Sequence, residues 1–268
     1  MTTDAYRVVI VNYAKSEAVL KLIGQLGAQH APPSSVSIID NSPLESAIPT
    51  GTIFQPYPFS IDLIRRPDNI GYANACNLGA NDGQWQWLVL INPDIEIENP
   101  SFLATLIQKC SGEDRLGCAG VAQRNPDGSY ERVARRFPSI AAIIGKRLPF
   151  LRHGILRDTV DRYLDSYDNR HDQAASPLVV DWLQSSFLII PRQSWIRCGG
   201  LDDRYFVFMA DTDFGRKCQK NNLRSILYPD LEISADGVRS SGGGIMDIFR
   251  KKTIRIHIRD AVRYFWRL

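Results

Sequence analysis

The sequence contains no long apolar run, so we expect no segment that crosses a membrane as a helix. The apolar run nearest the N-terminus, Tyr6–Val11, has the length of a strand and is too short for the core of a signal peptide. The five cysteines are dispersed, odd in number and without CxxC spacing, which argues against a disulfide framework and against a zinc site. These absences predict a reduced, cytoplasmic protein, at most peripheral at the inner face of the cell membrane.

A strong charge of either sign is also missing. The 268 residues carry a net charge of +3, too small to indicate a nucleic-acid partner, and no recognition motif accompanies it. Basic residues do concentrate at residues 249–268, which hold seven Lys or Arg and one Asp. This end can form an amphipathic helix suited to anionic lipid headgroups; the alternative is a helix docked on its own domain or in a homodimer. We expect a basic helical segment at 246–268 after one domain at 1–245.

Strand-like and helix-like patterns alternate along the chain and predict an α/β fold. Apolar, β-branched runs predict buried strands, and apolar residues at helical spacing predict helices. Their order predicts a mostly parallel sheet flanked by helices, with the ligand crevice beyond the carboxyl ends of the strands. The predicted strands are 6–11, 35–40, 61–65, 87–91, 117–122, 183–190 and 224–228, and the predicted helices are 16–29, 73–82, 101–109 and 212–222.

Polar side chains follow three of these strands directly. They are Asn12, then Asp40 with Asn41, then Asn92 with Asp94. One such cluster would be a turn, whereas three at one edge of one sheet indicate a binding site. Asp40 fits a carboxylate that accepts hydrogen bonds from a nucleoside, and its alternative is an Asx turn.

The segment RRPDNIGYANACN, residues 65–77, fits a diphosphate site. Asn69 and Gly71 predict a turn, and the small residues that follow let a helix begin close to a ligand. A helix N-terminus presents free N–H groups and a positive dipole end, which favour a diphosphate. The alternative is an ordinary capped turn between a strand and a helix.

Two carboxylates fit catalytic roles. Asp94 ends the run WLVLINPD at the predicted mouth of the sheet, where it suits a divalent cation held by few protein groups and by phosphate oxygens. Its alternative is a strand that simply ends at Asn-Pro. Asp211 follows an aromatic run at a predicted helix start and fits a general base, and its alternative is a helix N-cap.

Five motifs occur in order along the chain: VVIVNY, SIIDNSP, RRPDNIGYANACNLG, VLINPDIEI and GGLDDRYFVFMADTDFGRK. In this order and spacing they resemble the family-2 glycosyltransferases, and specifically the rhamnosyltransferase-like branch, over residues 5–245. The resemblance implies a GT-A fold with a Rossmann-like sheet and a nucleotide-diphosphate sugar donor. It also implies a Mg²⁺ or Mn²⁺ cofactor and inversion at the anomeric carbon.

The resemblance assigns roles to individual residues. Asp94 is the final acid at the place of the metal-binding DxD motif, and Asp211 takes the place of the catalytic base. Asp40 matches the nucleoside-binding acid. The residues expected beside the donor, from the resemblance and from the strand ends, are Asn12, Asn41, Arg66, Asn69, Gly71, Asn77 and Asn92.

Two positions depart from the family pattern. Ala210 stands where the family usually has Glu before the catalytic Asp, and Ala235 stands where it often has a His that binds metal or phosphate. Asp236 is adjacent to Ala235 and is our candidate for a substitute metal ligand. Arg239, Arg135 and Arg136 are candidate fixed cations for the diphosphate, and for all three the alternative is a solvated arginine on the surface.

These assignments predict an inverting glycosyltransferase. The branch implies that rhamnose is taken from deoxythymidine-diphosphate-rhamnose and given to a saccharide or lipid-linked saccharide in cell-surface polysaccharide synthesis. Because of Ala210 and Ala235, the alternative is a non-catalytic protein of the same fold that binds a nucleotide sugar or a glycan. A sugar nucleotidyltransferase fits less well, because VNYAKSEA lacks the glycines of a triphosphate-binding loop.

Overall fold

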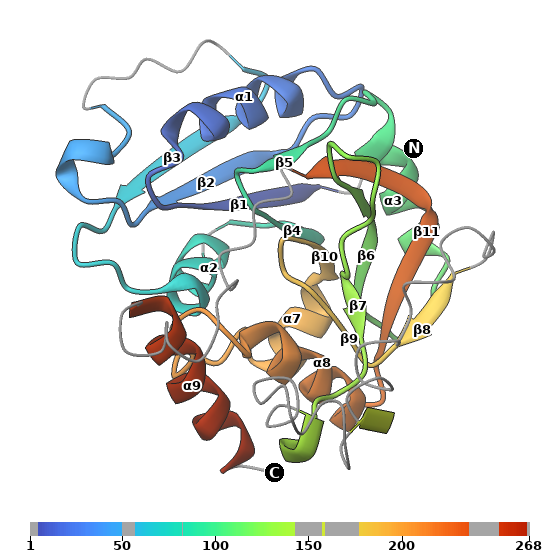
Figure 1. Cartoon of the computed structure of the whole chain (residues 1–268). Helices are drawn as coiled ribbons and strands as arrows, with labels where there is room; N and C mark the ends of the chain where they lie inside the picture. Colours follow the sequence, from blue (N-terminus) through green and yellow to red (C-terminus); the bar gives the residue numbers. More distant parts are fainter. Residues whose placement is uncertain are drawn as a thin grey trace.

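The described residues build a large mixed sheet with helices on both faces and a second sheet of two strands (Figure 1). The computed structural model describes residues 5–49, 57–81, 83–142, 157–158, 177–235 and 252–266. Its strands are β1 (Tyr6–Asn12), β2 (Ser35–Asp40), β3 (Ser60–Arg65), β4 (Trp87–Ile91), β5 (Ile95–Glu96), β6 (Leu116–Arg124), β7 (Ala134–Arg135), β8 (Leu178–Val180), β9 (Trp182–Leu183), β10 (Phe187–Pro191) and β11 (Arg224–Ala235). Its helices are α1 (Ser16–Gly27), η1 (Leu44–Ser46), α2 (Tyr72–Ala80), α3 (Phe102–Ser111), α7 (Arg192–Cys198), α8 (Ala210–Lys220) and α9 (Lys252–Phe265).

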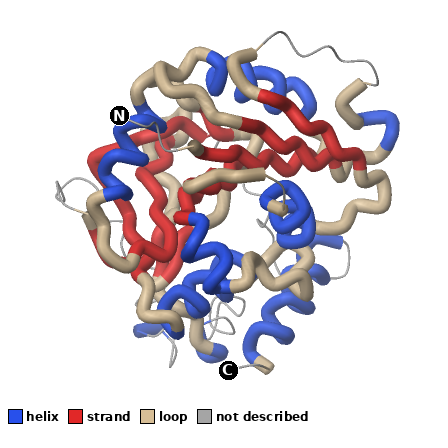
Figure 2. The backbone as a smooth tube through the Cα atoms, turned by 180° about the vertical axis from the view of Figure 1, so that it is seen from behind, coloured by secondary structure: helices blue, strands red, loops and turns tan. Residues whose placement is uncertain are grey.

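The larger sheet has the order β3-β2-β1-β4-β10-β6-β11-β5, with β8 paired to β11, and it runs unbroken across the molecule in Figure 2. Strands β3, β2, β1 and β4 are mutually parallel, and so are β6 and β11. Strand β10 lies between the two groups and is antiparallel to both. The predicted α/β sheet flanked by helices is therefore confirmed, and its carboxyl-end edge collects the loops that follow β1, β2 and β4.

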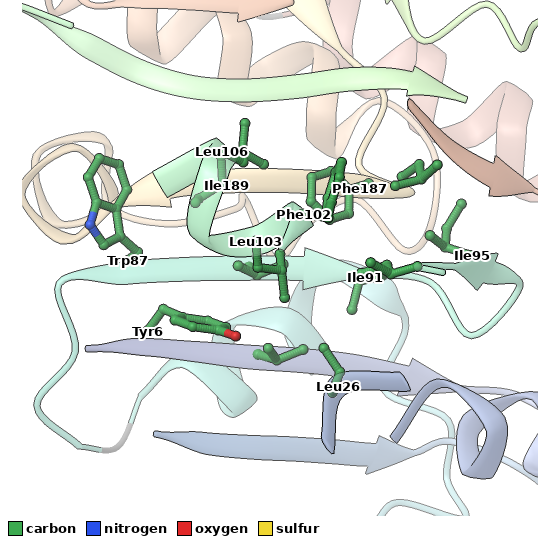
Figure 3. Close-up of a cluster of buried hydrophobic side chains, with 14 of the residues drawn as sticks. Tyr6, Leu26, Trp87, Ile91, Ile95, Phe102, Leu103, Leu106, Phe187 and Ile189 are labelled. Atoms are coloured by element: carbon green, nitrogen blue, oxygen red, sulfur yellow. The ribbon is translucent and has the colours of Figure 1, made fainter. Parts of the chain in front are cut away.

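Side chains alternate between two cores, one on each face of the sheet. Val89 and Ile91 of β4 face the core under α1 and α3, whereas Leu88 and Leu90 face the core under α2, α7 and α8. Figure 3 shows the first core, where Phe102 of α3 packs edge-on against Phe187 of β10 with ring centroids 5.7 Å apart. Because the central strands are buried on both faces, they appear as unbroken apolar runs in the sequence.

The structure revises several predicted boundaries. The apolar stretch predicted as one strand at 183–190 is two strands, β9 and β10, separated by a turn at residues 184–186. Strand β11 continues to Ala235, and its pairing shifts between Tyr228 and Glu232, where Pro229 has no N–H to give to the ladder. Helix α7, which begins directly after Pro191, was not predicted.

Helix α9 docks on the domain that precedes it, as its place beside the lower helices in Figures 1 and 2 indicates. Asp260, Ala261 and Tyr264 form its buried side, and Tyr264 belongs to the second core. Val262 and Trp266 of the same helix are exposed. The predicted domain boundary at 245/246 lies outside the described residues. Among the helices that the structure describes, none combines the length and the hydropathy needed to cross a bilayer.

Candidate active site

The ends of β1 and β2 are tied together by the carboxylate of Asp40. Asn12 lies opposite Asp40 in the strand register and donates from Nδ2 to Asp40 Oδ1 across 3.0 Å. The backbone N–H of Ser42 donates to the same oxygen at 3.1 Å, and that of Ile48 donates to Oδ2 at 2.8 Å. The Ser42 bond is an Asx turn. Asp40 thus organises the loop after β2, and its contact with a nucleoside stays a prediction.

Asn41 joins this edge to the start of α2. Its Nδ2 donates to the carbonyl of Gly71 at 3.3 Å, whereas its Oδ1 is buried and has no hydrogen-bond partner in the structure. A buried acceptor without a partner costs about 1–3 kcal/mol. Such an atom beside a helix N-terminus is a natural place for a donor group of a ligand.

The turn before α2 requires its glycine. Asn69 and Gly71 both have positive φ, 43° and 83°, and Asn69 Oδ1 accepts the N–H of Gly71 at 3.1 Å. A Cβ on Gly71 would lie 2.6 Å from the carbonyl oxygen of Phe206. That carbonyl accepts the N–H of Tyr72 at 2.6 Å, so the start of α2 is clamped to the loop that precedes α8. Asn69 and Gly71 therefore shape the turn itself.

Two other predicted donor-side residues differ in how they are held. Arg66 has a buried Nε that makes no hydrogen bond and lies 3.5 Å from Asp68 Oδ1, and its contact with the donor stays a prediction. Asn77 is bound at both ends of its amide to the backbone of Leu201, at 2.8 Å and 3.0 Å. Asn77 thus holds the Gly200–Leu201 turn, and a contact between Asn77 and the donor stays a prediction.

Asp94 lies just beyond β4, where it meets the loop between β1 and α1. Its Oδ2 pairs with Lys15 Nζ at 2.8 Å, while its Oδ1 is buried without a hydrogen-bond partner. Two residues on, Glu96 pairs with Lys21 of α1 at 2.6 Å. A cavity of about 140 Å³ opens between α1 and this strand end. This volume fits water or an ion and is too small for a nucleotide sugar.

Asp211 lies in the first turn of α8 and is held from two sides. Its Oδ1 accepts the N–H of Thr212 at 2.8 Å, and its Oδ2 accepts the N–H of Ser185 at 3.3 Å. Burial raises the pKa of Asp211, and the opposing effects of these two bonds and of the Arg135 guanidinium do not cancel it. A carboxylate that is costly to keep charged is a stronger proton acceptor, as a general base requires.

The turn at residues 184–186 joins the Asp94 side of the sheet to the Asp211 side. The N–H of Asn92, at the end of β4, donates to the carbonyl of Ser186 at 2.8 Å. Ser185, the residue before Ser186, donates its backbone N–H to Asp211 Oδ2. The carbonyl of Ser185 accepts the hydroxyl of Tyr72 at 2.7 Å. Ser185 and Ser186 were not singled out from the sequence because they lie inside a run that reads as one strand.

The C-terminal end of β11 reaches the same edge. Ala235 pairs with Ile95, the residue after Asp94, and Ser234 pairs with Glu96. Asp236 and Arg239 lie outside the described residues, so their roles stay predictions. Arg135 lies in β7 with its guanidinium 5.4 Å from the centre of the Trp182 ring, and the carbonyl of Arg136 accepts the indole N–H of Trp182.

A divalent cation fits Asp94 in one respect. A buried carboxylate oxygen without a partner is the type of ligand that Mg²⁺ and Mn²⁺ take. Within the part of the chain that the structure describes, no three His, Cys, Asp or Glu residues gather into a metal site. A cation here would need oxygens of a bound diphosphate to complete its coordination.

Glycosyltransferases of known structure share this fold. The mannosyltransferase PcManGT from Pyrobaculum calidifontis, in complex with GDP-Man and Mn²⁺, matches with a TM-score of 0.57 and 15% identity over 96% of this chain and 64% of its own. GalNAc-T7, solved with UDP, GalNAc and Mn²⁺, matches with a TM-score of 0.58 and 13% identity over 91% of this chain and 45% of its own. The chain thus spans less than two thirds of either protein, at 64% and 45%. The fold is that of the GT-A glycosyltransferases.

A relative among curated proteins narrows the class. N-acetylglucosaminyl-diphospho-decaprenol L-rhamnosyltransferase of Mycobacterium tuberculosis (strain CDC 1551 / Oshkosh) is 29% identical over 257 residues, which cover 90% of this chain and 78% of that protein. No family model matches the sequence. The relative and the GT-A fold confirm the resemblance to rhamnosyltransferase-like enzymes of family 2 that the motifs predicted. The chain is a glycosyltransferase.

Proposed function

We propose that this enzyme transfers rhamnose from a deoxythymidine-diphosphate donor to a lipid-linked saccharide, with inversion, in cell-surface polysaccharide synthesis. The curated relative supports rhamnose as the transferred sugar and a lipid-linked saccharide as the acceptor, since its name specifies L-rhamnosyl transfer to N-acetylglucosaminyl-diphospho-decaprenol. The observation that carries the proposal is the 184–186 turn, which bonds to the strand end that precedes Asp94 and to Asp211. This link between the two segments supports our inference that the two acids border one site.

Asp211 acts as the general base in this proposal. It takes the proton of the acceptor hydroxyl while that oxygen forms a bond to the anomeric carbon, and the bond from the anomeric carbon to the diphosphate oxygen breaks on the opposite face. Displacement from the opposite face inverts the anomeric configuration. A positioned general base contributes about 10²- to 10⁴-fold to rate. Burial, which raises the pKa of Asp211, and the two backbone N–H groups that fix its orientation both suit this role.

The donor diphosphate lies at the start of α2. No side chain caps this helix start in the described structure, and the positive end of the helix dipole favours an anion there. Arg66 supplies a cation and Asn41 an acceptor to the nucleotide. Asn12 and Asp40 hold the loop under the nucleoside.

Mg²⁺ or Mn²⁺ is the proposed cofactor, held by Asp94 and by Asp236. Both structural neighbours were solved with Mn²⁺, which supports a divalent ion. Ala235 pairs with Ile95, and Asp236 follows Ala235 directly in the chain. When bound, the cation neutralises the charge that develops on the departing diphosphate. Lys15, 2.8 Å from Asp94 Oδ2, supplies a second positive charge at this edge.

The acceptor's lipid calls for contact with a membrane, and α9 offers a surface for it. Its outward side carries a row of arginines, Arg255, Arg259 and Arg263, at four-residue spacing. An adjacent apolar row, at the same spacing, holds Ile258, Val262 and Trp266, which are 38%, 59% and 89% exposed. Residues four apart share one helix face. A basic row beside an apolar row fits an anionic lipid surface.

The rival function is a non-catalytic nucleotide-sugar-binding protein. Ala210, at the place of the usual Glu, is 1% exposed and packs in the second core. The core thus accommodates an apolar side chain at a position where the family has a carboxylate. The rival predicts nucleotide binding without turnover.

A donor screen followed by a transfer assay tests the proposal. Thermal unfolding with a panel of nucleotide sugars and Mn²⁺ identifies the donor, because a ligand at about 100 times its Kd stabilises the folded state by about 2.7 kcal/mol. We expect deoxythymidine-diphosphate-rhamnose to give the largest shift and to be turned over on a lipid-linked N-acetylglucosaminyl diphosphate. Asp211→Asn should keep the thermal shift and lose at least about a hundredfold in kcat. Binding without turnover by the unaltered enzyme would favour the rival.

A further inference from the structure

Asp260 of α9 is a fully buried acid, with 0% exposure, and it binds a loop that is distant in the sequence. Its Oδ2 accepts the backbone N–H groups of three consecutive residues, Phe206, Val207 and Phe208, at 3.0, 3.1 and 3.2 Å. Consecutive N–H groups that converge on one oxygen form an anion-binding nest. Here the anion is a side chain of the protein itself.

The second oxygen of Asp260 is satisfied as well. Nε and Nη2 of Arg259 both lie 3.3 Å from Oδ1. The same guanidinium lies 5.7 Å from the centre of the Phe206 ring. A buried carboxylate is tolerated when it is paired and hydrogen-bonded, and Asp260 meets both conditions. The nest and the cation together explain an acid within an otherwise basic helix.

The loop bound by Asp260 also touches both ends of the proposed active site. The carbonyl of Phe206 accepts the N–H of Tyr72, which begins α2 on the donor side. Three residues after Phe206, Met209 adopts a positive φ of 68°, and α8 then begins and places Asp211 in its first turn. Phe206 is therefore fixed by α2 on one side and by α9 on the other.

Two further contacts also join α9 to this loop. His257 lies against Phe208 with ring centroids 4.6 Å apart, and Arg263 donates to the carbonyl of Arg204. Tyr264 instead contacts α8, where its hydroxyl meets Arg216. Helix α9 thus holds the loop 204–208 through one set of residues and the body of the domain through another. This separation allows the two functions to be tested independently.

We propose that Asp260 is a positioning residue for the transfer reaction. It holds residues 206–208 against the start of α2 and so fixes the place of Asp211 relative to the donor. The proposal rests on the role of Asp211 as base. The conformation of this loop, with a positive φ at Met209, is supported by three charge-assisted hydrogen bonds to one oxygen of Asp260. A displacement of about 1 Å in a catalytic group can cost about a hundredfold in rate.

The test compares Asp260→Asn and Asp260→Ala with Tyr264→Phe in the full chain. The Ala variant loses all three bonds to the loop, the Asn variant keeps one acceptor oxygen, and the Phe variant loses the hydroxyl that meets Arg216 of α8. We expect kcat to fall about 10- to 100-fold in the Ala variant and less in the Asn variant, with the donor KM within about twofold of the unaltered value. Tyr264→Phe should lower Tm and leave kcat within about twofold.

Amide hydrogen exchange gives a readout that does not depend on turnover. The N–H groups of residues 206–208 should exchange faster in both Asp260 variants and at the original rate in Tyr264→Phe. A folded Asp260→Ala or Asp260→Asn variant with unchanged kcat and unchanged exchange overturns the proposal while leaving the transferase function intact. If the Ala variant does not fold, the Asn variant decides. If the unaltered enzyme transfers no sugar, the proposed function fails, and exchange still shows whether Asp260 orders the loop.

Discussion

The backbone N–H of Ser185 points at the carboxylate of Asp211, 3.3 Å from its Oδ2. Ser185 belongs to the turn between β9 and β10, and the next residue, Ser186, accepts the N–H of Asn92 at the end of β4. One short turn therefore bonds to the strand end that leads to Asp94 and to the helix start that carries Asp211. The site depends on the reversed strand β10, because only an antiparallel neighbour of β4 begins where β4 ends.

The pH dependence of transfer should report the environment of Asp211. Burial raises the pKa of this carboxyl above its ordinary value of 3.8, and a base must be deprotonated to act. We expect kcat/KM to fall on the acid side at a pH above 3.8. The Arg135 guanidinium lowers this pKa, so Arg135→Gln should move the acid limb to higher pH. A pH–rate profile of both proteins checks this, and an acid limb that moves to lower pH in the variant contradicts it.

The same raised pKa has a consequence for stability. A carboxyl whose pKa is higher in the folded state favours folding most below its unfolded pKa of 3.8, and this contribution is lost as pH rises through the folded pKa. At neutral pH the charged, buried Asp211 therefore costs stability in order to serve catalysis.

Asp94 should carry the response to the divalent cation. Asp94→Asn removes the proposed ligand, so Mn²⁺ should no longer increase the thermal stabilisation given by the nucleotide sugar. Glu96→Gln is the matched control, because Glu96 also forms an ion pair, with Lys21 of α1 at 2.6 Å, and lies two residues after Asp94. Glu96→Gln should respond to Mn²⁺ as the unaltered protein does. An unchanged response in Asp94→Asn would remove Asp94 from the metal site.

Gly71 should tolerate no side chain. Its φ of 83° disfavours alanine, and the added Cβ would lie 2.6 Å from the Phe206 carbonyl. We expect Gly71→Ala to lower the free energy of unfolding by about 1–3 kcal/mol, measured by urea denaturation. Gly24 is the control, since it lies in α1 with nothing within 4 Å of an added Cβ. Gly24→Ala should raise the free energy of unfolding by up to about 1 kcal/mol. Equal effects of the two substitutions would contradict the close approach at Gly71.

The outer side of α9 should bind anionic vesicles. A variant with Val262→Ala and Trp266→Ala loses two apolar side chains that are 59% and 89% exposed. This variant should bind anionic vesicles roughly tenfold more weakly. Leu44 in η1 is 79% exposed and provides the control, since Leu44→Ala removes exposed apolar surface elsewhere. Sedimentation with vesicles of anionic and of zwitterionic lipid measures both effects. Binding that is equal for the two lipids, or equal for the two variants, would exclude this surface as the membrane contact.

The central part of the fold was predictable because its signals are local. Strands β1, β2 and β4 are apolar, β-branched runs buried on both faces, and each ends at polar residues that the chain order alone places on one edge. The turn before α2 was predictable for the same reason, because Asn69 and Gly71 are a local signal in the sequence. Asp40 shows the limit of this reasoning, since both of its oxygens hold backbone that lies near it in the chain.

The parts that sequence reasoning missed depend on long-range pairing. Residues 183–190 read as one strand, because nothing local shows that Ser185 and Ser186 turn there to meet Asp211 and Asn92. Asp260 reads as a lone acid among arginines, and its three bonds to the loop 206–208 exist only once α9 has docked. The sequence separation is 26 positions for Ser185 and Asp211 and 52 to 54 positions for Asp260 and its loop.

A crystal structure with the donor nucleotide diphosphate and Mn²⁺ would show directly whether the two acids share one site. We expect the diphosphate at the start of α2, the cation on Asp94, and the sugar between the cation and Asp211. A diphosphate bound elsewhere, with Asp94 and Asp211 on separate surfaces, would contradict this expectation.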